Sequence, residues 1–212
     1  MKLRWPAHAV AVAFVLSLAC SSAPNLPGDE AMGTFEFHAT PVSQDCALGS
    51  IPDGGFDFEV IARHNKSGDG AWLLIGGIVG DAGFDGQYVT SVRTAPRAFL
   101  QADGGSCNPQ VTDGGAITCS MTLTETLTFA LLSESQFQAV GNHCPDNPLD
   151  GGVPQPGADS GVTRPGSVGG GTSYDAVEAC GTLVDVASID GGCNAACLVP
   201  CTLTYQVSGA RK

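Results

Sequence analysis

Positive charge is scarce in this chain of 212 residues, which has nine Lys and Arg residues against 21 Asp and Glu residues and a formal net charge of −12. A protein that binds nucleic acid neutralises phosphates with clustered basic side chains, and this sequence has no such cluster. The same scarcity argues against attachment to anionic lipid through basic side chains. The composition therefore predicts that nucleic acid is not a partner.

Long apolar runs and catalytic motifs are missing as well. The longest apolar stretch, residues 7–19, is shorter than the roughly 20 residues of a transmembrane helix. Neither Gly-x-Ser-x-Gly nor His-Glu-x-x-His occurs. His143 and Ser160 lie in segments that faintly resemble the motifs of trypsin-like proteases, but they are only 17 residues apart, which favours a chance match. We therefore expect no enzyme activity, no catalytic or metal-binding residues and no cofactor.

The first residues have the pattern of an export signal. Lys2 and Arg4 precede the apolar stretch, which ends in the small residue Ala19 followed by Cys20. A positive start, an apolar run and a small residue before the cleavage site predict a secretory signal over residues 1–19. Removing Lys2 and Arg4 leaves seven basic residues and a net charge of −14 for the 193 residues from Cys20 onward.

The position of Cys20 makes this segment resemble the signal of a bacterial lipoprotein. That family usually has Leu three residues before the cysteine, whereas here Ser17 holds that place and Leu16 lies one residue further back. The resemblance implies that Cys20 receives lipid, palmitate included, and becomes the mature N-terminus. It also implies a lipid-anchored protein of the bacterial envelope, on the outer membrane, with the bilayer as its partner. Two or more acyl chains anchor a protein stably.

Eight cysteines remain when Cys20 is set aside, and an even number in an exported chain predicts up to four disulfides, with about 105 possible pairings. The candidates are Cys46, Cys107, Cys119, Cys144, Cys180, Cys193, Cys197 and Cys201. The spacing of the last three would also suit a zinc site with His143 as a fourth ligand. An oxidising compartment favours disulfides over that site.

Alternating apolar residues predict strands through most of the remaining chain. The predicted strands cover residues 34–38, 56–60, 72–75, 87–94, 97–100, 117–131 and 202–207. Ser133 and Gln136 form a capping-box pattern, which predicts a short helix with Gly141 at its C-terminal end. The fold class is therefore all-β. We expect an antiparallel sandwich of about seven to nine strands braced by disulfides, with a β-barrel as the alternative.

Glu125 interrupts the most regular of these patterns. Odd positions from Ile117 to Leu131 are apolar except Glu125, and so long a strand should bend, change sheets or break, most readily at Glu125. In one interpretation Glu125 reaches solvent at the bend. In the other it is a buried carboxylate with a raised pKa, which makes it a weak site candidate.

Loop-like segments complete the domain organisation. Residues 20–33 form a flexible tether behind the lipidated cysteine, and residues 34–212 form a single β domain. Within it, residues 145–173 form a long loop with five prolines and eight glycines. Asp-Gly-Gly occurs five times, which favours hairpin turns over calcium loops, and residues 81–86 are the better calcium candidate.

The sequence predicts a lipid-anchored, non-catalytic binding or structural module whose ligand, protein or glycan, it does not identify. Two alternatives are open: a secreted hydrolase with carboxylate acid and base groups, and a calcium-dependent adhesion module.

Overall fold

The computed structural model describes residues 25–45, 54–66, 70–99, 119–146, 148–155, 161–168, 173–191 and 201–212. Predictions that concern residues 1–24, including the signal, Cys20 and the first residues of the tether, lie outside these ranges, whereas residues 30–33 of the predicted tether belong to the first strand. Within the described residues, no helix is both long and apolar enough to span a membrane.

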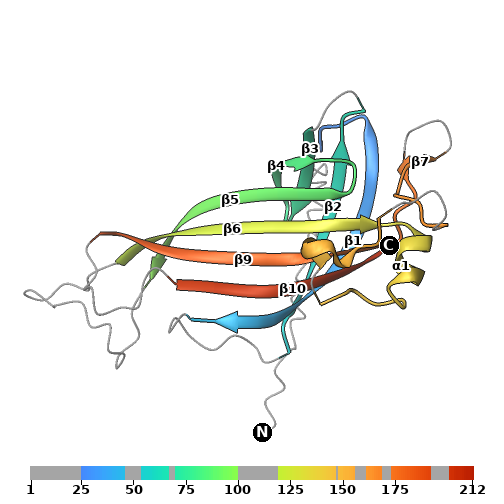
Figure 1. The fold of residues 1–212 in the computed structure, drawn as a ribbon. Coiled ribbons are helices and arrows are strands. Elements are labelled where there is room, and N and C mark those ends of the chain that lie inside the picture. Colours follow the sequence, from blue (N-terminus) through green and yellow to red (C-terminus); the bar gives the residue numbers. More distant parts are fainter. Residues whose placement is uncertain are drawn as a thin grey trace, which may run out of the picture.

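Eight antiparallel strands form one sheet that closes on itself as a barrel (Figure 1). They are β1 (Glu30–Gln44), β2 (Phe56–His64), β3 (Gly70–Ile75), β4 (Ile78–Phe84), β5 (Tyr88–Phe99), β6 (Cys119–Leu132), β9 (Glu178–Gly191) and β10 (Cys201–Arg211). Strands adjacent in this order pair with each other, and β10 pairs with β1 to close the ring. The all-β prediction is confirmed. The chain adopts the barrel that was the alternative, instead of the sandwich.

Two short strands extend the sheet beyond the ring. These are β7 (Ser167–Val168) and β8 (Ser173–Tyr174), and β8 pairs in parallel with β1 through Ala31 and Ser173 alone. They belong to the long Pro/Gly segment, so part of that segment is folded against the barrel.

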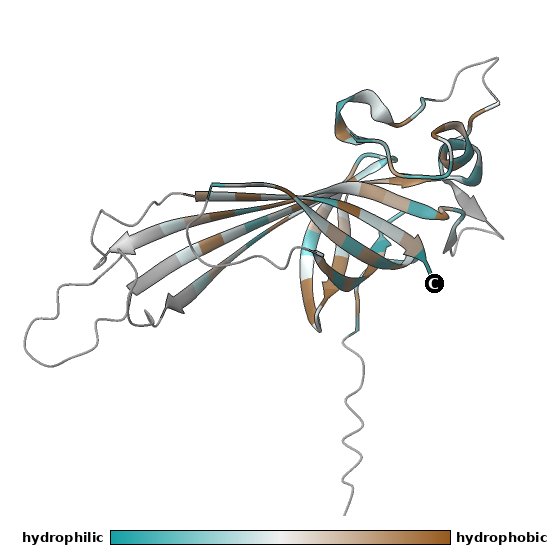
Figure 2. Cartoon of the chain, turned by 90° about the horizontal axis from the view of Figure 1, so that it is seen from below, coloured by the Kyte–Doolittle hydropathy of each residue, from teal (hydrophilic) through white to brown (hydrophobic). Residues whose placement is uncertain are grey.

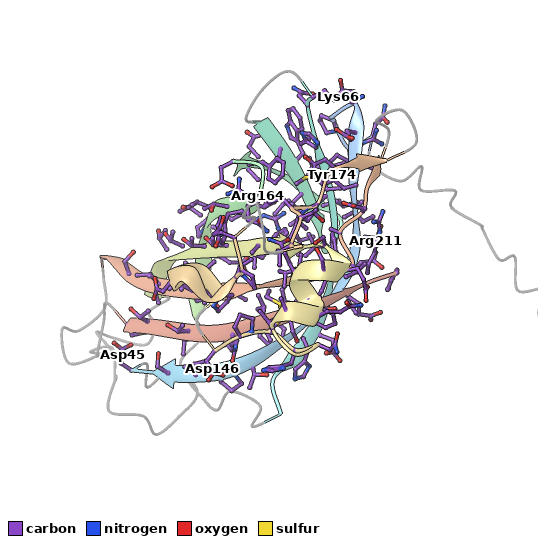
Figure 3. All side chains as sticks on the ribbon, turned by 45° about the vertical axis from the view of Figure 1, so that its right-hand side comes forward. Asp45, Lys66, Asp146, Arg164, Tyr174 and Arg211 are labelled. Carbon is purple, nitrogen blue, oxygen red and sulfur yellow. A yellow bond between two sulfur atoms is a disulfide. The ribbon has the colours of Figure 1, made fainter. Side chains whose placement is uncertain are left out.

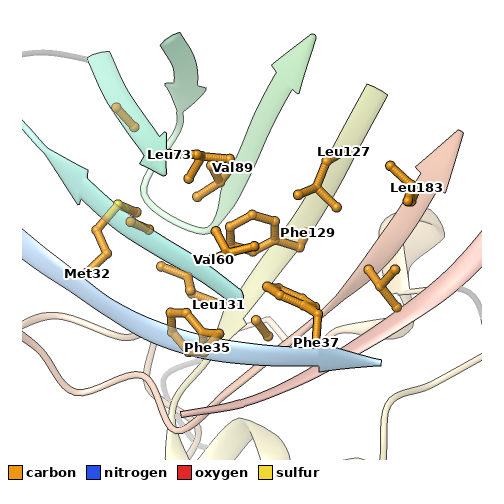
Figure 4. Close-up of a cluster of buried hydrophobic side chains, with 14 of the residues drawn as sticks. Met32, Phe35, Phe37, Val60, Leu73, Val89, Leu127, Phe129, Leu131 and Leu183 are labelled. Atoms are coloured by element: carbon orange, nitrogen blue, oxygen red, sulfur yellow. The ribbon is translucent and has the colours of Figure 1, made fainter. Parts of the chain in front are cut away.

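The core fills the barrel along one face of each strand, as alternation requires. Phe37 lies at its centre, stacked on Phe58 with ring centroids 5.4 Å apart and in edge contact with Phe129 at 5.3 Å. Figure 4 shows the surrounding aliphatic side chains pointing into the same space from facing strands. Burial of these rings and chains, at roughly 25 cal/mol per Å² of apolar surface, is the main stabilising contribution to the barrel.

One end of the barrel is closed by a helix and a buried amide network. Helix α1 (Glu134–Ala139) begins with the predicted capping box of Ser133 and Gln136, and Gly141, with φ of 81°, follows its end. The Gln136 side chain donates to Gln87 Oε1 at 2.9 Å and to the Pro154 carbonyl at 3.0 Å. The network joins α1 to Gln87, just before β5, and to Pro154, two residues after the turn η1 (Pro148–Gly152), so the segment that follows this turn is held by a specific contact.

A disulfide fastens this end to the sheet. Cys144, just after α1, is bonded to Cys180 on β9, 36 positions further along the sequence. Cys201 is disulfide-bonded as well. Cys119 lies on β6, whereas Cys46, Cys107, Cys193 and Cys197 lie outside the described residues.

Two strand predictions need correction. β6 continues through Glu125 with no interruption in its pairing to β5 and β9 there, so of the three expected possibilities a break and a change of sheet do not occur at this residue. β5 is likewise one strand through Pro96, which faces Thr122 of β6. A proline is tolerated there because β5 pairs with β4 only at Thr90 and Val89, which leaves the distal part of β5 at an edge of that pairing.

Candidate functional site

At one end of the barrel β2 begins and the β3–β4 hairpin turns. β5, β6, β9 and β10, with the last residues of β1, continue beyond this level as a ribbon, which extends away from the barrel in Figures 1 and 2. We call this end of the barrel the mouth. Six inward-facing side chains mark it: Phe56, Ile78, Arg93, Glu125, Asp185 and Tyr205. Tyr205 is itself buried, and each of the other five lies an even number of residues from a buried side chain of its own strand. Because successive side chains of a strand point to opposite faces, all six face the inside of the barrel.

Three charged residues form a row across the mouth. Arg93 of β5 lies directly opposite Glu125 of β6, and Glu125 lies directly opposite Asp185 of β9. Directly opposed residues of antiparallel strands have Cβ atoms about 4.5–5.5 Å apart, so the two carboxylates are neighbours. The sheet thus brings together an acidic pair and a guanidinium from segments that are distant in sequence.

Asp185 is the electrostatically strained member of the row. Burial, together with the smaller effect of the charge of Glu125, raises its pKa to about 6. Its Oδ1 atom is buried and has no hydrogen-bond partner among the residues that the structure describes. Burial also raises the pKa of Tyr205, with Asp185 as a second cause. A carboxylate held in this way gains free energy from any cation or donor that reaches it.

Arg93 does not neutralise the pair. Its Nη2 donates to the Ile78 carbonyl at 3.0 Å, whereas its Nε is buried without a partner. All three residues belong to the described part of the chain, and no ion pair within 4.0 Å joins Arg93 to either carboxylate. The guanidinium instead holds the β3–β4 turn against β5.

The rim of the mouth is apolar. Phe56 is 37% exposed and Ile78 is 64% exposed, although both belong to the inward-facing register. The ring of Phe56 packs edge-on against Tyr205 with centroids 5.3 Å apart. Apolar surface next to a few unpaired polar groups is a combination that ligand sites use.

The weak candidate Glu125 is therefore half-buried on the inner face, next to a second carboxylate. Sequence reasoning found Glu125 because it interrupts an apolar register. It missed Asp185, because residues 178–191 were not predicted to be a strand. Arg93 lies in a predicted strand, and the alternation of β5 could have placed it on the inner face.

Other candidates from the sequence do not form sites. Asp85 Oδ1 accepts the backbone N–H groups of Gln87 and Tyr88, at 2.9 and 2.7 Å, so this carboxylate caps a turn and is not arranged for calcium. Asp81 lies on β4, which replaces the predicted calcium loop. His143 is exposed and its Nδ1 contacts the Gly141 carbonyl at 3.2 Å. Of the partners proposed for it, Cys201 is disulfide-bonded, whereas Ser160, Cys193 and Cys197 lie outside the described residues.

A second row crosses the outer face of the barrel, with Asp57, His38 and Ser208 on β2, β1 and β10. His38 Nδ1 lies 2.6 Å from Asp57 Oδ1, in the order of a hydrolase triad. However, a Cβ at Gly55 would lie 3.4 Å from His38 Nε2, so the ring leans over β2, and no hydrogen bond joins it to the described Ser208. Ser208 is not activated in this arrangement.

The hollow beside Ser208 is also too small for a substrate site. Its volume is about 200 Å³, against roughly 300–1,000 Å³ for ligand pockets. The residues that line it are Thr40, Cys144, Gln206 and Ser208.

No family model, curated protein or solved structure matches this chain.

Proposed function

We propose that the chain is a lipid-anchored, non-catalytic binding module of a bacterial envelope, with the mouth as its binding surface. The observation that carries the proposal is the unpartnered Oδ1 of Asp185, held between apolar surfaces opposite a second carboxylate. Leaving such a group unpaired costs free energy that a ligand would recover on binding. The remaining core is filled by side chains, so the mouth is where a ligand finds both apolar and polar groups.

The chemistry of the mouth favours a ligand with a cationic amine and an apolar part. Two carboxylates against one guanidinium leave the row with a net negative charge, and the whole chain is acidic by 12 charges. An ammonium group can satisfy Asp185 and Glu125 together, while a hydrocarbon portion covers Phe56 and Ile78. An anionic ligand would meet repulsion from the same pair.

The anchor supports the envelope assignment. Lipid on Cys20 would leave residues 21–29 between the membrane and the first strand, which begins at Glu30. A linker this short, whose described residues 25–29 have no regular structure, holds the barrel close to the bilayer surface. Retention on the outer membrane is part of the proposal.

Calorimetric titration of octylammonium into the purified domain tests the binding surface. The wild type is expected to bind it saturably at pH 7.5 and to bind octanoate at least tenfold more weakly, which corresponds to about 1.4 kcal/mol. The double variant Glu125→Gln, Asp185→Asn keeps the shape of the mouth and should lose this preference. Asp57→Asn, which removes an exposed outer carboxylate, is the control and should bind like the wild type. Equal binding of both amphiphiles by the wild type would overturn the proposal.

A second candidate function, hydrolysis by paired carboxylates, is favoured by one observation. An acid with a pKa of about 6 next to a second carboxylate is the combination that general acid–base catalysis uses. A panel of chromogenic aryl glycosides separates the two functions. Turnover that disappears in both Asp185→Asn and Glu125→Gln would establish the hydrolase, whereas the binding proposal expects no turnover.

A further inference from the structure

The disulfide between Cys144 and Cys180 joins a sheltered residue to one that borders a hollow. Cys180 is fully buried on β9, whereas Cys144 is half-buried in the segment after α1. Cys144 lines the small hollow described above, together with Thr40, Gln206 and Ser208, and Cys180 does not. An external group therefore reaches the disulfide from the side of Cys144.

The hollow is smaller than an ordinary ligand pocket, but it has room for a small thiol. Its volume of about 200 Å³ is several times the roughly 30 Å³ that one water molecule occupies in the liquid. Apart from Cys144, the side chains that line it carry only neutral hydroxyl and amide groups. A thiol of a few heavy atoms can thus approach the Cys144 sulfur without displacing a charged side chain.

The carboxyl group of Glu178 lies beside both sulfur atoms. Glu178 and Cys180 are two residues apart on β9, so alternation places their side chains on the same face of the sheet. A carboxyl oxygen of Glu178 and the sulfurs of Cys144 and Cys180 all lie within 4.8 Å of one another. The sheet thus holds an acid next to the bond that an incoming thiol would break.

Glu178 has apolar cross-strand neighbours and no charged partner. It lies opposite Leu132 of β6 and Ala210 of β10. Burial raises the pKa of the Glu178 carboxyl, which favours the neutral acid. Among the residues that the structure describes, no ion pair within 4.0 Å and no side-chain hydrogen bond involves Glu178. Its proton is therefore not committed to another group.

The other titratable and charged groups in this region are exposed, neutral or bonded to the backbone. The exposed side chains of the segment after α1 are His143, Asp146 and Asp150. Burial is the main cause that raises the pKa of the Tyr88 phenol, so this group stays neutral up to pH 9. Asp175 accepts a backbone N–H at 2.6 Å. Arg211 donates to the Tyr174 carbonyl, and Figure 3 shows these two residues on the same side of the molecule. The carboxyl beside the disulfide is therefore the acid that can supply a proton there.

We propose that the Cys144–Cys180 disulfide is an exchange site for small external thiols, at which Cys144 is attacked and Glu178 protonates the Cys180 sulfur. The incoming thiolate forms a bond to the Cys144 sulfur while the bond between the two cysteines breaks, and the electron pair of that bond goes to the Cys180 sulfur. The carboxylic acid of Glu178 then transfers its proton to this sulfur. The products are a mixed disulfide at Cys144, a thiol at Cys180 and a carboxylate at Glu178. The external thiol is the reductant, and the exchange is independent of the mouth.

The place of reaction in the wild type gives the first test and needs no variant. The folded protein is incubated with 2,2,2-trifluoroethanethiol, quenched with acid, treated with N-ethylmaleimide and analysed by peptide mass spectrometry. We expect the thiol on Cys144 and the maleimide on Cys180. Cys201 is also disulfide-bonded but is 1% exposed, so it should acquire the thiol at least about tenfold more slowly than Cys144. A thiol adduct on Cys180, or one that forms equally fast on Cys201, would overturn the proposal.

The variant Glu178→Gln tests the proton donor. A glutamine amide keeps the shape of the side chain but has no acidic proton to transfer. At pH 5 we expect the wild type to exchange about tenfold faster than this variant, with rates expressed per concentration of thiolate. The wild-type rate constant should fall as the pH rises through the pKa of Glu178. By pH 9 the advantage should be lost, because the ionised carboxylate repels the leaving thiolate.

Glu134→Gln is the matched control, because Glu134 is an exposed carboxyl on the neighbouring helix α1. It should keep the wild-type dependence of the exchange rate on pH, whereas the rate constant of Glu178→Gln per thiolate should not depend on pH. A Glu178→Gln variant with the pH profile of the wild type would contradict the proposal.

Discussion

At the scale of single residues, the molecule places two acids where burial works against their charge. Asp185 and Glu30 both lie on inward-facing positions, but only Glu30 has an imidazole beside it, with His64 Nε2 2.9 Å from Glu30 Oε2. The pKa of Asp185 is raised because burial and the charge of Glu125 favour its neutral form. The consequence for stability follows from linkage: the folded state binds this proton more tightly than the unfolded state.

Asp185→Asn should therefore stabilise the protein at neutral pH. The stability associated with the neutral acid is fully present below the ordinary pKa of aspartate, about 3.9, and is lost as pH rises through about 6. Since the side chain is only partly buried, solvent screening reduces the gain to about 1 kcal/mol, or about 2–4 °C in melting temperature at pH 7.5. At pH 4 the variant and the wild type should melt together. A lower melting temperature for the variant at pH 7.5 would show that the ionised carboxylate is stabilised by a partner.

At the scale of elements, alternation was enough to find the strands with large inner side chains. β1, β2, β3, β5, β6 and β10 all overlap predicted strands. β9 was missed because its inner positions include Ala179, Gly181 and Ala187, which give a weak apolar signal. Gly181 is also required by packing, since a Cβ there would lie 2.0 Å from the Thr128 carbonyl oxygen. β4 was missed because Gly80, Asp81 and Gly83 have the composition of a turn.

The contrast between strands with a strong apolar pattern and strands with a weak one also explains how much of the candidate site could be predicted. Glu125 is visible in the sequence as a charge in an apolar register, whereas its partner becomes visible only when β9 is known. The pairing of β1 with β10, which decides barrel over sandwich, joins residues more than 150 positions apart and leaves no local pattern. The pairing of Cys144 with Cys180 was likewise one of many that the sequence allowed.

The amide network beside α1 leads to a prediction about how the elements are held together. Gln136→Ala would leave the buried Gln87 Oε1 and the Pro154 carbonyl without their donor. Each unpaired buried group costs about 1–3 kcal/mol, so we expect a loss of about 3 kcal/mol in denaturant unfolding. Gln138→Ala, on the exposed face of the same helix, is the control and should change stability by less than about 0.5 kcal/mol. Equal effects of the two substitutions would show that the network does not hold α1 to the barrel.

At the scale of the whole molecule, the barrel has two ends with different chemistry. The tether enters at the end that contains Glu30 and His64, and the mouth lies at the other end of β1 and β2. An anchored barrel would thus present the mouth away from the site of attachment. With an acidic chain and few basic side chains, the acyl chains on Cys20 are the attachment that the sequence supports.

Fractionation of cells that express the wild type or Cys20→Ala tests this attachment. The wild type should remain in the membrane fraction until detergent is added, and its mature mass should include the acyl chains. Cys20→Ala should appear in the soluble fraction without that added mass. Equal release of the two proteins would contradict the anchor and leave the barrel as a secreted domain.

The most direct test of the binding account is to map where an amphiphilic amine contacts the folded domain. In a two-dimensional NMR titration with octylammonium at pH 7.5, we predict saturable shifts at the amides of Phe56, Ile78, Arg93, Glu125 and Asp185. Amides at His38 and Ser208, which present their side chains on the outer face, should not move. Shifts confined to the outer face, or shifts at the mouth that octanoate reproduces equally, would contradict the account.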